Sequence, residues 1–243
     1  MRRFLALVVL ALCAGVAFAQ PAAKPTRILF IGNSLTSATD IPGRLAKLAR
    51  VMGRPVEVET VASNGYSLED HWNEDRARAA IRKGWDLVVL QQGTSGRADS
   101  KAQLVEYTRK FAGPIRDAGA KPALYMVWPL SDRPHEFLGA MEAYRAAAEA
   151  VDGLLIPVGE AWFRALTKDK RLRLYGDAIH PGSLGSDLTV LTMYLAIFPA
   201  GPQEFDEAFV AKIARQLEIP ERVRDALFDA ATLAIDQPLR ITK

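Results

Sequence analysis

The chain has 243 residues, with 31 Lys and Arg against 28 Asp and Glu, a formal net charge of +3 and one cysteine. The basic excess is small and no Lys/Arg cluster is interleaved with aromatic residues, so nucleic acid binding has little support. One cysteine cannot form a disulfide framework or a Cys-ligated zinc site.

The first 19 residues have the pattern of a secretory signal peptide. Two arginines precede an apolar stretch, residues 4–16, that is too short to span a bilayer comfortably. The small-x-small pattern ending at Ala19 then predicts cleavage. An uncleaved membrane anchor is the alternative. Cleavage would remove Cys13 and lower the net charge to +1, because two of the 31 basic residues are lost. We therefore expect an exported protein, periplasmic or extracellular, with no membrane contact after cleavage.

After a short leader, residues 20–25, β-type runs alternate with helical patterns. Unbroken apolar runs, typical of strands buried on both faces, occur at residues 27–31, 56–61, 87–90, 123–127 and 154–158. Helical patterns occur at residues 41–52, 68–83, 101–118, 136–151, 161–168, 184–198, 203–217 and 221–235. This alternation predicts one α/β domain, residues 26–243, with a parallel sheet and helices on both faces. Sites in such sheets form beyond the carboxyl ends of the strands.

A serine follows the first predicted strand. Ser34 lies in a turn that Gly32 permits, where a nucleophile would be presented at the carboxyl edge of the sheet. Taken alone, Gly32-Asn33-Ser34 is more simply interpreted as a turn followed by a helix N-cap.

Asp177 and His180 share one loop near the end of the chain. An Asp three residues before a His can orient the imidazole, and Pro181 and Gly182 stiffen the segment. A structural Asx turn made by Asp177 is the alternative. Together with Ser34, these residues supply a nucleophile, a base and a group that holds the base, as nucleophilic acyl transfer requires.

The other two histidines fit simpler roles. His71 and Glu74 could share a helix face as half of a metal site, but with no third ligand in view a packing or surface role is preferred for His71. His135 lies in a polar loop, as a solvated residue or at the wall of a substrate pocket.

Two further segments offer N–H donors to a developing oxyanion. Gly65 follows the second strand, where a glycine lets a backbone N–H approach a substrate closely, although Asn64-Gly65 would also suit an ordinary turn. Gln91 and Gln92 end the third strand, and buried amides of this kind must find partners. One or both could instead satisfy loop backbone.

These motifs resemble the SGNH (GDSL-like) hydrolase superfamily over nearly the whole mature chain. Gly32-Asn33-Ser34-Leu35 is similar to the first block, with Asn33 where Asp is more common, and Asp177-x-x-His180 to the last. Gly65 matches the second-block glycine. The third block departs, because Ser95 occupies the slot of its oxyanion asparagine. Gln92-Gly93-Thr94-Ser95 is similar to the Gln-Gly-Glu-Ser segment of some carbohydrate acetylesterases, so the donor role goes to Gln92, with Gln91 as the fallback.

The resemblance implies a flavodoxin-like α/β/α sandwich with five parallel strands in the order 2-1-3-4-5. It implies a serine esterase with Ser34, Asp177 and His180 as triad and Ser34, Gly65 and Gln92 as oxyanion donors, requiring no metal or cofactor. The expected substrate is a small-molecule or glycan ester with a short acyl group. Two alternatives are a catalytically silent carbohydrate-binding domain and a nucleotide-binding protein, although the glycine pattern lacks both nucleotide fingerprints.

Overall fold

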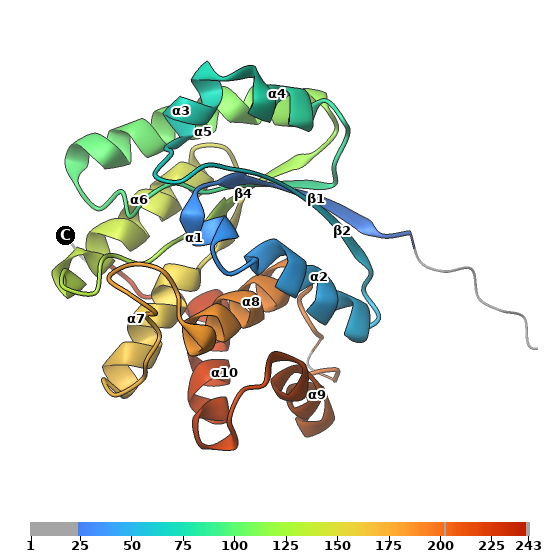
Figure 1. The fold of residues 1–243 in the computed structure, drawn as a ribbon, viewed down its shortest axis with the longest axis vertical. Helices are drawn as coiled ribbons and strands as arrows, with labels where there is room; N and C mark the ends of the chain where they lie inside the picture. Colours follow the sequence, from blue (N-terminus) through green and yellow to red (C-terminus); the bar gives the residue numbers. More distant parts are fainter. Residues whose placement is uncertain (1–23, 202, 242–243) are drawn as a thin grey trace, which may run out of the picture.

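The computed structural model describes residues 24–201 and 203–241, so the expected signal peptide, residues 1–19, lies outside the described residues. The strands form one parallel sheet in the order β2-β1-β3-β4-β5, as predicted (Figure 1). Their bounds are β1 Thr26–Gly32, β2 Val56–Ala62, β3 Leu87–Leu90, β4 Lys121–Tyr125 and β5 Leu154–Ile156.

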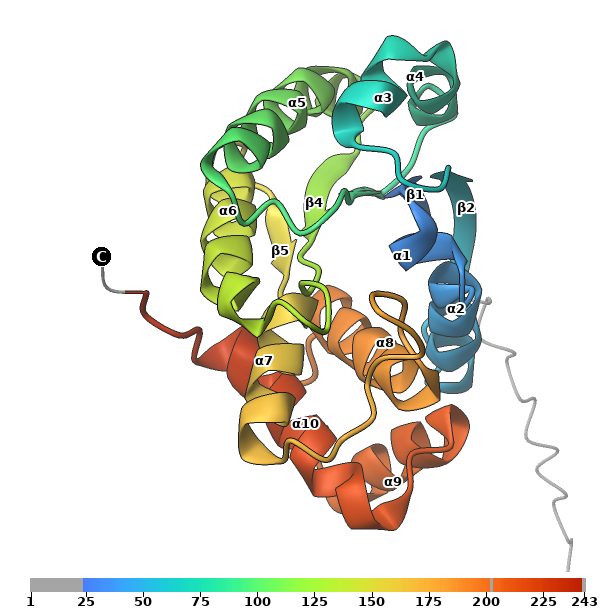
Figure 2. The same cartoon turned by 60° about the vertical axis from the view of Figure 1, so that its left-hand side comes forward.

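Helices cover both faces of this sheet. In chain order they are α1 Ser34–Ser37, α2 Ile41–Val51, α3 Leu68–Asn73, α4 Asp75–Ile81, α5 Ala98–Asp117, the 3-10 turn η1 Pro134–Glu136, α6 Phe137–Glu149, α7 Val158–Lys168, α8 Ser183–Ile197, α9 Glu207–Leu217 and α10 Glu221–Asp236. Helices α3 to α6 pack on one face, and α2 and α8 pack on the other (Figure 1). Beyond α8, α9 and α10 form a further layer (Figure 2). Within the described ranges, no helix is both long and apolar enough to cross a membrane.

The central strands explain how the site is positioned. All four residues of β3 are buried, as are the last five of β1, because helices cover both faces. The parallel register sets Ile31 beside Leu90, so the two chains leave the sheet together. Residues 32–34 and 91–92 therefore emerge side by side at the carboxyl edge.

One long predicted helix is two helices in the structure. The expected helix at residues 68–83 divides at Glu74, which is extended with φ −96° and ψ 141°. Asn73 and Asp75 flank this break, and both residue types favour helix ends over helix interiors. The Glu74 carboxylate also accepts a hydrogen bond from Tyr66 Oη at 2.8 Å.

Boundaries also differ around the last two strands. β4 begins at Lys121, two residues before the expected 123–127 segment, and Met126 to Trp128 form a buried loop. β5 ends at Ile156 because Pro157 has no N–H for the sheet, and Val158, expected in the strand, begins α7. At residues 203–217, α9 starts later than expected, where Asp206 caps Phe209 N.

Candidate active site

Ser34 is half-buried and opens helix α1 directly after β1. The residue before it, Asn33, caps the helix by accepting from Leu35 N at 3.0 Å. Gly32 is needed for a different reason from the expected turn. A Cβ there would lie 2.4 Å from Gln91 Oε1 and 2.6 Å from Thr36 Oγ1, so a side chain would displace both of these groups.

Asp177 organises its loop and the imidazole at once. Its Oδ1 accepts from the backbone N–H of Ile179 at 2.8 Å and of His180 at 2.7 Å, which is the Asx turn considered as an alternative. Its Oδ2 lies 2.8 Å from His180 Nδ1. The Ile179 N–H first, then the His180 side chain and backbone, lower the pKa of Asp177 to about 2. The carboxylate is therefore charged at neutral pH.

This charge fixes the imidazole tautomer. An ionised carboxylate can only accept, so Nδ1 of His180 bears the proton and donates it to Asp177. Nε2 is then an acceptor, and it lies 2.9 Å from Ser34 Oγ, the hydroxyl of a residue 146 positions earlier. The three side chains form a continuous hydrogen-bonded line from hydroxyl to carboxylate.

The buried loop after β4 supports the segment that contains Asp177 and His180. Three hydrogen bonds join them: Trp128 Nε1 to Ile179 O at 2.8 Å, Ser131 N to Ala178 O at 2.9 Å, and Tyr175 Oη to Pro129 O at 2.9 Å. Trp128 is fully buried and stacks on Trp162 with ring centroids 3.6 Å apart. It is thus a core residue that holds the loop from behind.

Two backbone N–H groups near Ser34 are open. Within the described residues, neither Ser34 N nor Gly65 N has a hydrogen bond. Gly65 has φ +74°, a conformation that favours glycine, and no atom lies within 4 Å of the position a Cβ would take. Both N–H groups are available to an incoming oxygen.

The third-block side chains differ in their remaining donors. Gln91 uses both N–H bonds of its amide, on Asn33 Oδ1 at 3.0 Å and on Gln92 O. Ser95 Oγ donates to Gly93 O at 3.1 Å. Gln92 accepts from Leu68 N at 3.0 Å and donates one N–H to Ser95 Oγ at 2.9 Å, so its second N–H has no partner within the described residues. Of the three candidates, Gln92 alone keeps a donor.

The remaining histidines lie apart from this line. His71 is buried and donates from Nε2 to Gly32 O at 2.7 Å, and burial lowers its pKa, so the ring is neutral and packs as expected. His135 is exposed in η1. Across residues 24–201 and 203–241, no three His, Cys, Asp or Glu side chains gather as a metal site.

A five-stranded parallel sheet covered by helices on both faces thus has this serine, histidine and aspartate at its carboxyl edge. One similar solved structure, a Slackia heliotrinireducens protein classed as an SGNH hydrolase, has 31% sequence identity and a TM-score of 0.61. The match covers 73% of this chain and 100% of the Slackia heliotrinireducens chain. The chain therefore belongs to the SGNH hydrolases, and its class is that of hydrolases acting on esters.

More distant structures share the fold. A GDSL-like lipase from Parabacteroides merdae has 15% identity and a TM-score of 0.54, covering 72% of this chain and 96% of its own. The esterase EstA from a Pseudoalteromonas species has 16% identity and a TM-score of 0.52, covering 71% and 96%. No protein-family model and no curated protein matches the sequence.

Proposed function

We propose that this chain is a serine esterase that cleaves short-acyl carboxylic esters, such as O-acetylated carbohydrates, through an acyl-enzyme. The observation that supports this most directly is the line from Ser34 Oγ to His180 Nε2, 2.9 Å, and from His180 Nδ1 to Asp177 Oδ2, 2.8 Å. Both distances lie in the range required of a nucleophile, its base and the group that orients the base.

The proposed reaction has two halves. His180 Nε2 takes the Ser34 proton as Oγ attacks the ester carbonyl, and Asp177 stabilises the imidazolium. The N–H groups of Ser34 and Gly65, with the second amide N–H of Gln92, bind the tetrahedral oxyanion. His180 then protonates the leaving alcohol. Water, deprotonated by His180, attacks the acyl-enzyme and releases the carboxylic acid and Ser34.

The preference for a short acyl group rests on the surface around the site. The large apolar side chains exposed among the described residues are Val51, Leu138, Leu154, Phe205 and Leu233. None belongs to the segments that contain Ser34, Gly65, Gln92 or His180. A long acyl chain needs apolar surface to leave water, whereas an acetyl group needs little.

The test is hydrolysis of p-nitrophenyl acetate and butyrate by residues 20–243 and by the Ser34→Ala variant. We expect turnover by the wild type, faster on acetate, and loss of acyl-enzyme formation in the variant. A fluorophosphonate probe should label Ser34. A folded wild type that neither turns over nor labels would contradict the esterase and favour the silent carbohydrate-binding domain.

We also propose that the chain is exported, since its first 19 residues have the pattern of a signal peptide. Fractionation of expressing cells, with mass spectrometry of the mature N-terminus, tests this. Gln20 as the first residue is the expected result, whereas a full-length cytoplasmic product would contradict it.

A further inference from the structure

Two buried amide side chains, Asn33 and Gln91, form a hydrogen-bonded pair behind Ser34. Their exposed fractions are 6% and 1%. Gln91 Nε2 donates to Asn33 Oδ1 at 3.0 Å, and Gln91 Oε1 accepts from Asn33 N at 2.9 Å and Thr36 Oγ1 at 2.8 Å. The two residues are 58 positions apart in the chain, so only the fold brings them together. Buried networks whose members are satisfied are rigid.

This pair hydrogen-bonds to the backbone at or beside each residue that carries a proposed oxyanion donor. Beside Ser34, Asn33 Oδ1 accepts from Leu35 N at 3.0 Å. Beside Gly65, Asn33 Nδ2 donates to Tyr66 O at 3.1 Å. At Gln92, the Gln91 amide donates to the backbone carbonyl oxygen. The ends of β1, β2 and β3 are therefore joined through two side chains.

We propose that Asn33 and Gln91 are positioning residues that hold the three oxyanion donors in one geometry. The inference rests on the proposed function, and it gives Gln91 a role different from the donor role first considered. It also explains the amide at position 33. An aspartate there could still cap Leu35 N and accept from Gln91, but it has no N–H for Tyr66 O.

The test compares three variants with the wild type. Asn33→Asp keeps the shape and removes the donor to Tyr66. Asn33→Ser is uncharged and keeps a helix cap, in case the buried charge unfolds the first variant. Asn64→Asp is the matched control, because Asn64 is exposed and adjoins Gly65. This substitution adds the same charge without touching the pair. Turnover of p-nitrophenyl acetate and millisecond hydrogen exchange of residues 62–68 are measured on each.

We expect both Asn33 variants to lower kcat by about 10–100-fold, as small misplacement of catalytic groups does, while KM changes by less than about twofold. Exchange of residues 62–68 should accelerate in both and stay at the wild-type rate in Asn64→Asp. Equal losses of kcat in Asn33→Asp and Asn64→Asp would overturn the proposal, because charge alone would explain them. So would unchanged exchange in the Asn33 variants.

If the proposed esterase function is wrong, the experiment gives a different result. The wild type would then show no Ser34-dependent turnover. Hydrogen exchange needs no substrate, so acceleration at residues 62–68 would still support the amide pair as the structural tie, and its absence would still overturn it.

Discussion

Gly65 combines a left-handed backbone conformation with open surroundings. Its φ is +74°, and an added Cβ would meet no atom within 4 Å. The effect of Gly65→Ala on the protein should therefore come from backbone strain and not from a steric clash. We expect the free energy of unfolding to fall by about 1–2 kcal/mol. We expect kcat to fall by at least about tenfold as the N–H turns away from the oxyanion.

Gly53 is a matched control for this strain. It has φ +78° and equally open surroundings, but it follows α2 and adjoins none of the proposed donors. Gly53→Ala should lose similar stability in urea titration and keep its kcat. An equal loss of kcat in both variants would contradict the role of Gly65.

Asp187 is a buried carboxyl outside the triad. Burial raises its pKa to about 6. The positive charge of Arg44 lowers this pKa, and the negative charge of Glu218 raises it further. The folded protein therefore binds this proton more tightly than the unfolded chain. Its contribution to stability is complete below about pH 4 and is lost as the pH rises through about 6.

Asp187→Asn should remove this pH dependence. Between pH 4 and pH 7, the wild type should lose roughly 2 kcal/mol of stability relative to the variant, at about 1.4 kcal/mol for each unit of pKa. Urea unfolding of both proteins across this range measures the difference, and groups such as His71 titrate alike in both. A difference that does not vary with pH would refute the assignment.

At the scale of elements, two buried tryptophans with different N–H partners separate positioning from packing. Trp128 Nε1 donates to Ile179 O, beside His180, whereas Trp162 Nε1 donates to Thr189 Oγ1 at 3.3 Å, inside the core. The rings stack 3.6 Å apart, so both residues belong to one cluster.

Trp128→Phe and Trp162→Phe are therefore a matched pair. Each should lower the free energy of unfolding by about 1–3 kcal/mol, because an N–H partner is lost and a cavity is left. Trp128→Phe alone should lower kcat, since Ile179 loses the bond that holds the loop. Thermal unfolding and p-nitrophenyl acetate kinetics test this, and an equal effect of both variants on kcat would mean that packing alone matters.

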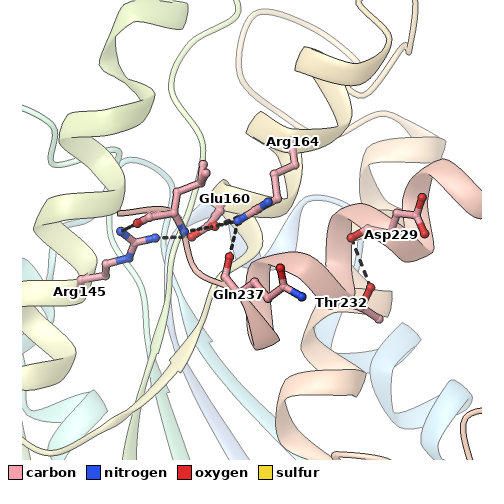
Figure 3. Close-up of polar contacts among 7 residues, drawn as sticks. Arg145, Glu160, Arg164, Asp229, Thr232 and Gln237 are labelled. Atoms are coloured by element: carbon pink, nitrogen blue, oxygen red, sulfur yellow. Dashed lines mark hydrogen bonds and ion pairs between the residues drawn. The ribbon is translucent and has the colours of Figure 1, made fainter. Parts of the chain in front are cut away.

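At the scale of the whole molecule, Glu160 joins the C-terminal segment to α6 and α7 (Figure 3). Its side chain is fully buried and bonds Arg145 from α6, Arg164 within α7, and Leu239 N at 2.8 Å. The same arginines donate onward to Leu239 O at 2.6 Å and Gln237 O at 2.5 Å. One buried carboxylate thus pairs with two arginines that hold the chain beyond α10.

Glu160→Gln should be strongly destabilising, by about 3–5 kcal/mol, because it leaves two partly buried arginine charges without their counter-charge. Asp229→Asn is the control. It also removes an ion pair between α7 and α10, to Lys168 at 2.8 Å, but that pair is exposed and should be worth about 1 kcal/mol or less. Urea denaturation of both variants compares them, and equal losses would show that burial does not govern these pairs.

Much of the fold was readable from the chain because its signals are local. The apolar runs of β1 and β3 and the periodicity of α2 each lie within a few residues, and they predicted the alternation correctly. The break at Glu74 and the early end of β5 at Pro157 were missed. At Glu74 the carboxylate has a hydrogen-bond partner, Tyr66, that lies outside the helix. At Pro157 a single missing N–H outweighed an apolar run.

The residue types and the order of elements can be read along the chain: a serine after the first strand, an Asp-x-x-His loop near the end, and a parallel sheet between them. It also suggested that Gln91 and Gln92 need partners, but not which. Those partners, the imidazole tautomer and the packing around Gly32 come from the fold, because they depend on residues far apart in the chain. The contacts that define the site join residues 58 and 146 positions apart, and hydrogen-bond geometry at that range is set by packing of the whole sheet.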